Sequence, residues 1–285
     1  MSLRSPERCT CIRGLCLLLL VVMASGSEAQ RLPQRQLRVC ADPNNLPFSN
    51  ERLEGFENKL AELIAHDLNA TLTYTWWAQR RGFIRHTLQA ATCDLVLGVP
   101  KRLDAVLTTN PYYRSTYVFV YRLDSGPAVR SLDDPLLRTV KIGVQLIGND
   151  GANSPPAHAL ARRHIIENVV GYSVYGDYAQ PHPTAQIIEA VATGAIDVAV
   201  VWGPIAGYFA RAQPVPLVVV PVTPAQDVPA LPFVFDIALG VRRGEEAFRA
   251  ELDAILQRRQ PEINRMLDAY GVPRPEAAEP RAAAQ

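Results

Sequence analysis

Short apolar runs alternate with amphipathic segments along most of the chain, and this alternation restricts the fold more than any other feature. The apolar run at 37–41 precedes a segment at 56–69 in which Phe56, Leu60 and Ile64 recur at helical spacing. Repeated alternation of this kind predicts an α/β protein. We expect strands at 37–41, 71–76, 94–99, 117–122, 140–145, 196–202, 217–222 and 233–241, and helices at 56–69, 82–90, 184–193, 245–258 and 262–270, with another starting at Ser154.

The expected elements form two sets, and the chain crosses to the second near residue 123 and returns near residue 224. This order predicts two lobes, lobe 1 from residues 30–123 with 224–272 and an inserted lobe 2 from 124–223. A cleft between the lobes, at the carboxyl ends of their parallel strands, is the expected binding site. The segment 273–285 is rich in Ala, Pro and Glu and is expected to be disordered.

Polar loops follow four of the predicted strands and are expected to face this cleft. Together with nearby aromatic and basic side chains, they give the candidate ligand or partner residues Asp42, Asn44, Asn45, Trp77, Arg80, Arg81, Gly98, Tyr113, Arg114, Asn149, Asp150 and Trp202. The arginines either clamp a carboxylate or lie solvated on the surface. The segments 77–81 and 112–114 either expose residue types common at interface hot spots or pack lobe 1.

Residues 1–29 have the pattern of a secretory signal. Arg4, Arg8 and Arg13 precede an apolar run at 15–24, and a small-x-small cleavage site ends at Ala29. The run is too short to span a bilayer, although a retained anchor is the alternative. We therefore expect a periplasmic protein, exported through the Sec pathway.

Removal of the signal leaves a neutral chain. The whole sequence has 29 basic and 28 acidic residues; the signal carries three Arg and two Glu, so 26 of each remain. A neutral chain lacks the basic surface that nucleic acid or an anionic membrane requires. Neither is an expected partner.

Export also leaves two cysteines, Cys40 and Cys93. In an oxidising compartment two cysteines favour a disulfide over a metal site. Cys40 lies in one predicted strand and Cys93 directly precedes another, so neighbouring parallel strands would bring the two together. Two separate buried thiols are the alternative.

Catalytic and cofactor motifs are absent from the sequence. It contains no G-x-S-x-G, Walker A, HExxH, GxGxxG or C-x-x-C-H pattern, and its five histidines are scattered. The loop before Ser154 could hold an anion at a helix N-terminus, but Asp150 would repel it. We expect a non-catalytic protein without a metal or cofactor of its own.

Several blocks resemble the type II periplasmic solute-binding proteins, including Leu37–Asp42, Gly55–Glu57 and Tyr270–Pro273. Longer blocks are similar to the solute-binding-like proteins found beside PQQ-dependent methanol and other alcohol dehydrogenases, the J proteins of methanol oxidation systems. These blocks are CADPNNLPFSN (40–50), WWAQRRGFIRHTL (76–88), CDLVLGVP (93–100), TTNPYYRSTYVFV (108–120), KIGVQLIGNDGANSPPAHALARR (141–163), GDYAQPHP (176–183) and IDVAVVWGPIAGYFA (196–210).

The resemblance implies a two-lobed, Venus flytrap accessory protein that supports assembly or activation of a PQQ-dependent methanol or alcohol dehydrogenase. Its implied partners are that dehydrogenase and its c-type cytochrome, with room for a small-molecule ligand. The alternative function is the substrate-binding component of an ABC transporter for a small polar solute. An enzyme on this scaffold would need an acid–base pair in the cleft, and the sequence identifies none.

One departure from the amino-acid-binding relatives bears on the ligand. Those proteins place an Asp eight residues after the Gly of a G-x-[IV]-D motif, where it holds an α-ammonium group. Here the motif begins at Gly194, and the position eight residues on is Trp202. Arg102 is the counterpart of their carboxylate-binding Arg, in a shorter segment. The resemblance therefore disfavours binding of free amino acids.

Overall fold

The computed structural model describes residues 35–148, 153–175, 177–228 and 230–275. The predicted signal at 1–29 and the predicted tail beyond residue 275 lie outside these ranges. The first tail residues are held in place, because Ser115 Oγ donates to the Pro273 carbonyl at 2.7 Å and Arg274 pairs with Asp268. None of the helices in the described ranges combines the length and hydropathy of a membrane span.

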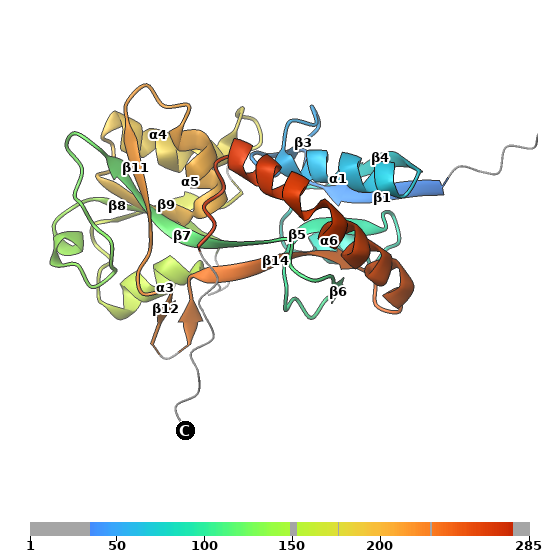
Figure 1. Cartoon of the computed structure of the whole chain (residues 1–285). Coiled ribbons are helices and arrows are strands. Elements are labelled where there is room, and N and C mark those ends of the chain that lie inside the picture. Colours follow the sequence, from blue (N-terminus) through green and yellow to red (C-terminus); the bar gives the residue numbers. More distant parts are fainter. Residues whose placement is uncertain (1–34, 149–152, 176, 229, 276–285) are drawn as a thin grey trace, which may run out of the picture. The chain divides into compact units, whose positions relative to one another are not determined.

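A mixed β-sheet runs through the described part of the chain (Figure 1). Parallel pairing joins β1 to β4 and β5, and β8 to β9 and β10, whereas β14 pairs antiparallel with β5 and β7. The strands in sheet order are β4 (Ala70–Trp76), β1 (Arg35–Ala41), β5 (Leu95–Pro100), β14 (Val234–Val241), β7 (Tyr113–Arg122), β10 (Val198–Trp202), β8 (Ile142–Leu146) and β9 (Val169–Ser173). The predicted α/β class is confirmed.

Shorter strands extend or accompany this sheet. β11 (Leu217–Pro221) pairs with β7, and β6 (Leu107–Thr108) pairs with β14. The remaining short strands form two separate pairs, β2 (Asn44–Asn45) with β3 (Ser49–Asn50) and β12 (Gln226–Asp227) with β13 (Leu231–Pro232).

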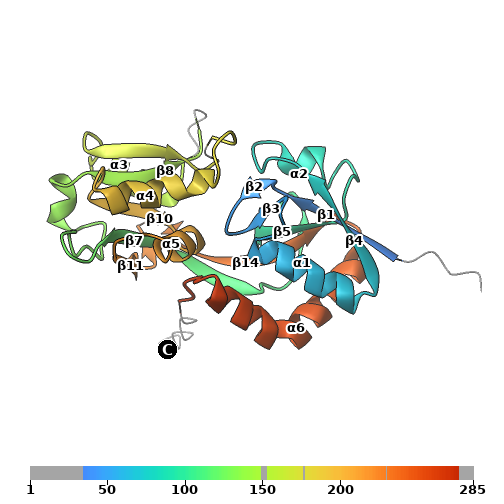
Figure 2. The same cartoon turned by 90° about the horizontal axis from the view of Figure 1, so that it is seen from above.

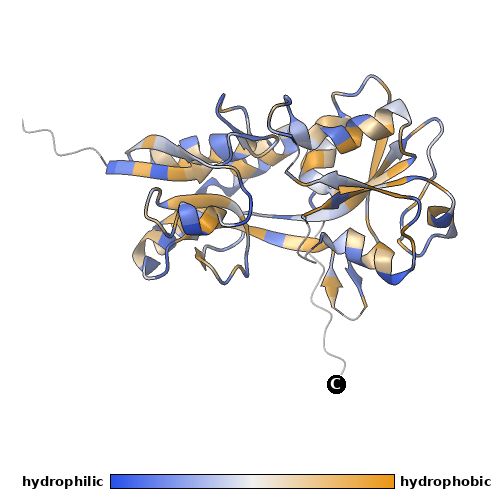
Figure 3. Cartoon of the chain, turned by 180° about the vertical axis from the view of Figure 1, so that it is seen from behind, coloured by the Kyte–Doolittle hydropathy of each residue, from blue (hydrophilic) through white to orange (hydrophobic). Residues whose placement is uncertain are grey.

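Apolar periodicity sets the buried face of the helices. In α1 (Phe56–Asp67), Phe56, Leu60 and Ile64 lie one turn apart and are fully buried. The other α-helices are α2 (Phe83–His86), α3 (Pro155–Arg162), α4 (Gln186–Thr193), α5 (Gly203–Ala210) and α6 (Glu246–Ala269), and the 3-10 turns are η1 (Pro135–Arg138) and η2 (Pro183–Ala185). Figure 3 shows hydrophobic residues concentrated along the strands and hydrophilic residues on the loops.

The two closing helices expected at 245–258 and 262–270 are instead the single helix α6, and that prediction was wrong. Pro261 lies inside the helix without breaking it. Burial of Leu256 and Ile263 holds both sides of the proline against the same core, and Arg259 pairs with Asp67 of α1 at 2.6 Å. Tertiary packing therefore overrides the local signal.

Figure 2 shows two groups of elements. The largest apolar cluster of the described residues is called core 1, two further clusters together make core 2, and a fourth, smaller cluster surrounds Cys40 and Cys93. Core 1 is built from β1, β5, β14, α1 and α6, and core 2 from β7, β8, β10, α3, α4 and α5. The sheet passes from one core to the other where β14 and β7 pair, with Val234 opposite Thr116 and Ile237 opposite Tyr113. This pairing also explains why β7 begins at Tyr113 rather than at the expected residue 117.

Candidate ligand-binding cleft

A cavity of about 310 Å³ lies between core 1 and core 2, beside the paired stretch of β7 and β14. Its volume is within the range of small-molecule sites, roughly 300–1,000 Å³. The lining residues are Asn45, Phe48, Glu57, Gln79, Gly98, Pro100, Tyr113, Tyr117, Gln145, Val174, Tyr175, Trp202, Ile205, Phe235 and Ile237. Most are apolar or aromatic; among them Glu57 is the one carboxylate, and none is Lys, Arg or His.

Four of the predicted site residues lie in this lining, namely Asn45, Gly98, Tyr113 and Trp202. They come from three separate strand ends and from the start of β7, which the sheet brings to one place. Asn149 and Asp150 lie outside the described residues.

Trp77 and Arg114 lie outside the cavity. The indole of Trp77 is 47% exposed and stacks on the His86 ring, with 5.6 Å between centroids. Arg114 is neutralised by Asp236, its neighbour across the β7–β14 pairing, at 2.7 Å. Because its charge is already paired, Arg114 does not supply a carboxylate clamp to the cavity.

The segment 112–113, considered above as an exposed partner surface, packs core 1 instead. Tyr112 and Tyr113 are buried, and the Tyr113 ring meets Phe56 edge-on at 5.9 Å. The physical reason is the position of these residues at the start of β7, beneath α1.

Asp42 holds together the loops at one rim of the cavity. Its carboxylate accepts hydrogen bonds from the backbone of Gln79 at 2.6 Å and of Asn44 at 2.8 Å, and from the hydroxyl of Tyr178. Burial, and then the Asp42 carboxylate, raise the pKa of Tyr178 well above its ordinary value.

Two further contacts join the same loops across the rim. The Arg80 guanidinium lies over the Tyr178 ring, 4.7 Å from its centroid, and Asn44 Nδ2 donates to the Gln180 carbonyl at 3.1 Å. Arg81, next in the chain, has an interaction partner of its own. The predicted residues Asp42, Asn44 and Arg80 therefore connect the loops after β1 and β4 to the loop after β9 rather than line the cavity.

Three aromatic rings form one wall of the cavity. The Trp202 ring lies 5.3 Å from that of Tyr117 and 5.9 Å from that of Phe235, and the Tyr117 and Phe235 rings are 6.3 Å apart. The interplanar angles are 62° to 74°, so each pair meets edge to face. Below we call Tyr117, Trp202 and Phe235 the aromatic corner.

Glu57 is the charged lining residue that the sequence did not point to. It occupies the first turn of α1, where its backbone N–H donates to the Phe48 carbonyl at 2.9 Å. Its carboxylate reaches Gly98, where φ is +70° and an added Cβ would collide with Glu57 Oε1. Burial, and then the nearby Asp42 carboxylate, raise the pKa of Glu57 to about 8.

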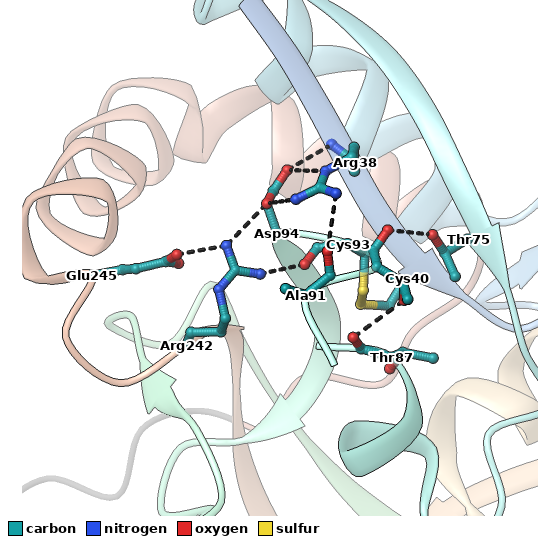
Figure 4. Close-up of polar contacts among 10 residues, drawn as sticks. Arg38, Cys40, Thr75, Thr87, Ala91, Cys93, Asp94, Arg242 and Glu245 are labelled. Carbon is teal, nitrogen blue, oxygen red and sulfur yellow. Dashed lines mark hydrogen bonds and ion pairs between the residues drawn. A yellow bond between two sulfur atoms is a disulfide. The ribbon is translucent and has the colours of Figure 1, made fainter. Parts of the chain in front are cut away.

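The disulfide (Figure 4) lies apart from the cavity, in the smaller apolar cluster with Phe83, Leu88 and Val96. Cys40 and Cys93 are bonded with their Cα atoms 5.5 Å apart, and their strands are parallel neighbours as the sequence suggested. Next to Cys93, the Asp94 carboxylate accepts from Arg38 Nη2 at 2.6 Å and from Arg242 Nη2 at 3.0 Å. Arg242 also pairs with Glu245 at 2.5 Å. In this ionic network Glu245 Oε2 is buried without a hydrogen-bond partner among the described residues.

Comparison with known proteins identifies the fold and the family. Residues 37–271 match the model of the bacterial extracellular solute-binding proteins, family 3. The chain belongs to this family. This family 3 solute-binding protein is 32% identical over 263 residues to Protein MoxJ of Methylorubrum extorquens, a match that spans 88% of this chain and 85% of MoxJ.

Two solved structures support the same relationship. The periplasmic binding protein XoxJ from Methylobacterium extorquens AM1 shares 36% sequence identity with a TM-score of 0.69, over 85% of this chain and 100% of XoxJ. MxaJ from Methlophaga aminisulfidivorans MPT shares 26% identity with a TM-score of 0.73, over 84% of this chain and 100% of MxaJ. The predicted type II periplasmic-binding-protein fold and the resemblance to the MoxJ and XoxJ type are confirmed.

The chemistry of the cavity differs from what a free amino acid needs. An α-carboxylate is normally held by a cation, and none of the described lining residues is Lys, Arg or His. Arg102 is not among the lining residues, and Trp202 provides a ring where an ammonium would need a carboxylate. The described residues also contain no group of three His, Cys, Asp or Glu side chains that could hold a metal ion.

Proposed function

We propose that this family 3 solute-binding protein is a periplasmic, non-catalytic accessory protein of a methanol or alcohol oxidation system, and that it supports assembly or activation of a PQQ-dependent dehydrogenase. The observation that carries the proposal is the similarity to MoxJ along 88% of the chain. The cavity also supports the proposal. It lies between the two cores, where a solute could bind, but none of its described lining residues is a cation for an amino-acid carboxylate.

The proposed organisation is two lobes, residues 30–123 with 224–272 and residues 124–223. The composition of the two cores supports this division, since core 1 draws on both chain segments of lobe 1. Phe233, however, packs in core 2 with Val222, so the return of the chain to lobe 1 lies close to β14. A dehydrogenase segment could enter between the lobes.

Trp77 is the partner contact that we propose on the surface of core 1. It is a large aromatic side chain, 47% exposed, two residues from the cavity-lining Gln79. Tryptophan is enriched at interface hot spots, where truncation to Ala costs at least about 2 kcal/mol. The neutral mature chain provides little long-range attraction, so local contacts of this kind would carry the affinity.

The test is deletion of the gene in its host, followed by assay of PQQ-dependent alcohol oxidation at constant dehydrogenase amount. We expect the specific activity to fall and to return with the wild-type chain. We expect Trp77→Ala to restore it poorly. Leu136→Ala is the matched control, because Leu136 is equally exposed at 47% but lies in η1, next to Leu137 of core 2, and it should restore activity fully.

Unchanged specific activity, with no co-purification of the two proteins, would contradict the accessory role. The second candidate function, a transporter receptor for a small polar solute, would then stand first. The cavity volume of about 310 Å³ favours that candidate, because it suits a small ligand. Genes for a permease and an ATPase beside this one would support it, whereas a quinoprotein dehydrogenase and a c-type cytochrome would support the accessory role.

A further inference from the structure

Among the described residues, the Glu57 carboxylate in the cavity has no basic counterpart. Glu57 projects to the lining, and no described residue makes an ion pair or hydrogen bond with its carboxylate. Asp42, the charged group that acts on it, is another acid. The Glu57 side chain is half-buried, and a carboxylate with reduced access to water is costly unless a cation or several donors meet it. The missing partner can come from a ligand.

The polar groups around Glu57 are largely committed to one another. Asn45 Nδ2 donates to Gln79 Oε1 at 3.2 Å, and Gln145 Oε1 accepts from the Trp202 backbone N–H at 3.3 Å. The cavity thus has few free acceptors for a ligand with many N–H groups. A primary ammonium needs three acceptors, whereas a fully methylated one needs none.

The aromatic corner supplies the remaining surface. Its three rings stand at steep angles to one another and line the same cavity as Glu57. Rings arranged as a cage attract a cation through their negative faces, and sites for quaternary ammonium groups use this device. Aromatic faces and one carboxylate together match a positive, apolar group.

We propose that the cavity binds a small organic cation without a carboxylate group, of the quaternary ammonium class, through Glu57 and the aromatic corner of Tyr117, Trp202 and Phe235. The inference goes beyond the proposed role in alcohol oxidation, and it is tested on the isolated protein. Its failure is therefore distinguishable from failure of the accessory role.

The charge of Glu57 selects against other ligands. Once ionised, it repels the carboxylate of an amino acid, and none of the described lining residues is a Lys or Arg that could offset that repulsion. A neutral ligand of the same shape fills the aromatic corner but leaves the carboxylate unpaired. A cation pairs with the Glu57 carboxylate and also contacts the rings of the aromatic corner.

Binding of the cation requires the ionised form of Glu57, so affinity depends on pH. The titratable groups that face Glu57 are Asp42 from the loop after β1 and Tyr112 and Tyr113 from the start of β7. On α1 itself, Lys59 is paired with Glu62 at 3.3 Å. Burial raises the pKa of both tyrosines well above its ordinary value, so they stay neutral. Affinity therefore follows the ionisation of Glu57.

The experiment is calorimetric titration of the mature protein with choline and with 3,3-dimethylbutan-1-ol, its uncharged analogue of the same shape. Choline carries no titrating proton in this range, so any pH dependence belongs to the protein. With the pKa of Glu57 at about 8, we expect choline affinity to rise about 50-fold from pH 6 to pH 8 and to level off above it. The alcohol should bind at least about tenfold more weakly than choline at pH 8 and show no such rise.

Two variants complete the test. Glu57→Gln should remove the preference for choline over the alcohol, and Trp202→Leu should weaken choline binding about tenfold or more. Glu62→Gln is the matched control on the same helix and should leave binding unchanged, because Glu62 lies outside the cavity. Thermal unfolding of each variant confirms that it is folded. Equal affinity for choline and the alcohol, choline affinity retained in Glu57→Gln, or no choline binding at any pH would each overturn the proposal.

Discussion

Two acidic side chains, Asp94 and Glu57, lie in opposite electrostatic environments. Asp94 precedes β5 and accepts hydrogen bonds from Arg38 and Arg242, while Glu57 begins α1 and has no basic partner. Burial alone would raise the pKa of Asp94, but its hydrogen bonds to the two arginines lower it below the ordinary value. Burial raises the pKa of Glu57 to about 8. The chain neutralises one carboxylate for stability and leaves the other available for binding.

The largest expected effect comes from removing the disulfide bond beside Asp94. Replacing both Cys40 and Cys93 with Ser should lower the free energy of unfolding by about 4 kcal/mol, because the bond closes a loop with a sequence separation of 53. Urea unfolding of the variant against the oxidised wild-type protein measures the difference. Thiol titration of denatured, unreduced mature protein should find no free cysteine, and two reactive thiols would contradict the bond.

The second test removes the paired charge. Asp94→Asn should cost about 2–3 kcal/mol, since it leaves Arg38 and Arg242 without their shared acceptor. A lowered pKa stabilises the folded state above the ordinary value of 3.8, and this stabilisation is lost as the pH falls below it. The deficit of the variant should therefore be full at pH 7 and shrink in acid. Asp124→Asn, which breaks an exposed pair with Arg122, is the control and should change stability little.

The third test replaces Glu57, and it should raise the free energy of unfolding rather than lower it. The folded state holds the proton of Glu57 up to about pH 8, whereas the unfolded chain releases it near 4.5, so the wild-type protein loses stability as the pH rises between these values. Glu57→Gln should therefore be more stable than the wild-type protein at pH 9 and equal to it at pH 4. Chemical unfolding at both pH values measures it. Destabilisation at pH 9 would mean that Glu57 has a structural partner after all and would remove the contrast with Asp94.

The last prediction is that amino acids do not bind to the protein. Titration of the wild-type protein with the common amino acids should give no heat of binding, because the cavity lining lacks a cation for their carboxylate. Micromolar affinity for any of them would show that the cavity resembles an ordinary amino-acid site and that Glu57 serves as its ammonium ligand.

The sequence was sufficient for the parts of the molecule that local patterns determine. Strand and helix periodicity predicts the α/β class, and the loops at strand ends lead to Asn45, Gly98 and Trp202 because parallel strands end at one edge. The failure at Pro261 is of another kind. There a local helix-breaking signal competes with burial on both sides, and only the tertiary structure shows which prevails.

Long-range pairing explains what the sequence did not reveal at the site. Arg114 looked free because its partner Asp236 lies 122 residues away, and only the register of β7 and β14 brings the two together. Glu57 looked like an ordinary acidic residue in the first turn of a helix, a favourable position in any protein. The block Gly55–Glu57 contributes to the family resemblance, and its sequence carries no sign that the carboxylate lines a cavity.

The paired stretch of β7 and β14 has a mechanical consequence. It is the place where the sheet passes between the two cores, and it supplies Tyr113, Phe235 and Ile237 to the cavity, with Tyr117 directly after it. Any bending of this ribbon must move the cavity wall, and any molecule that presses on the wall must resist the bending. The stiffness of the connection between the two cores and the occupancy of the cavity are therefore set by one stretch of backbone.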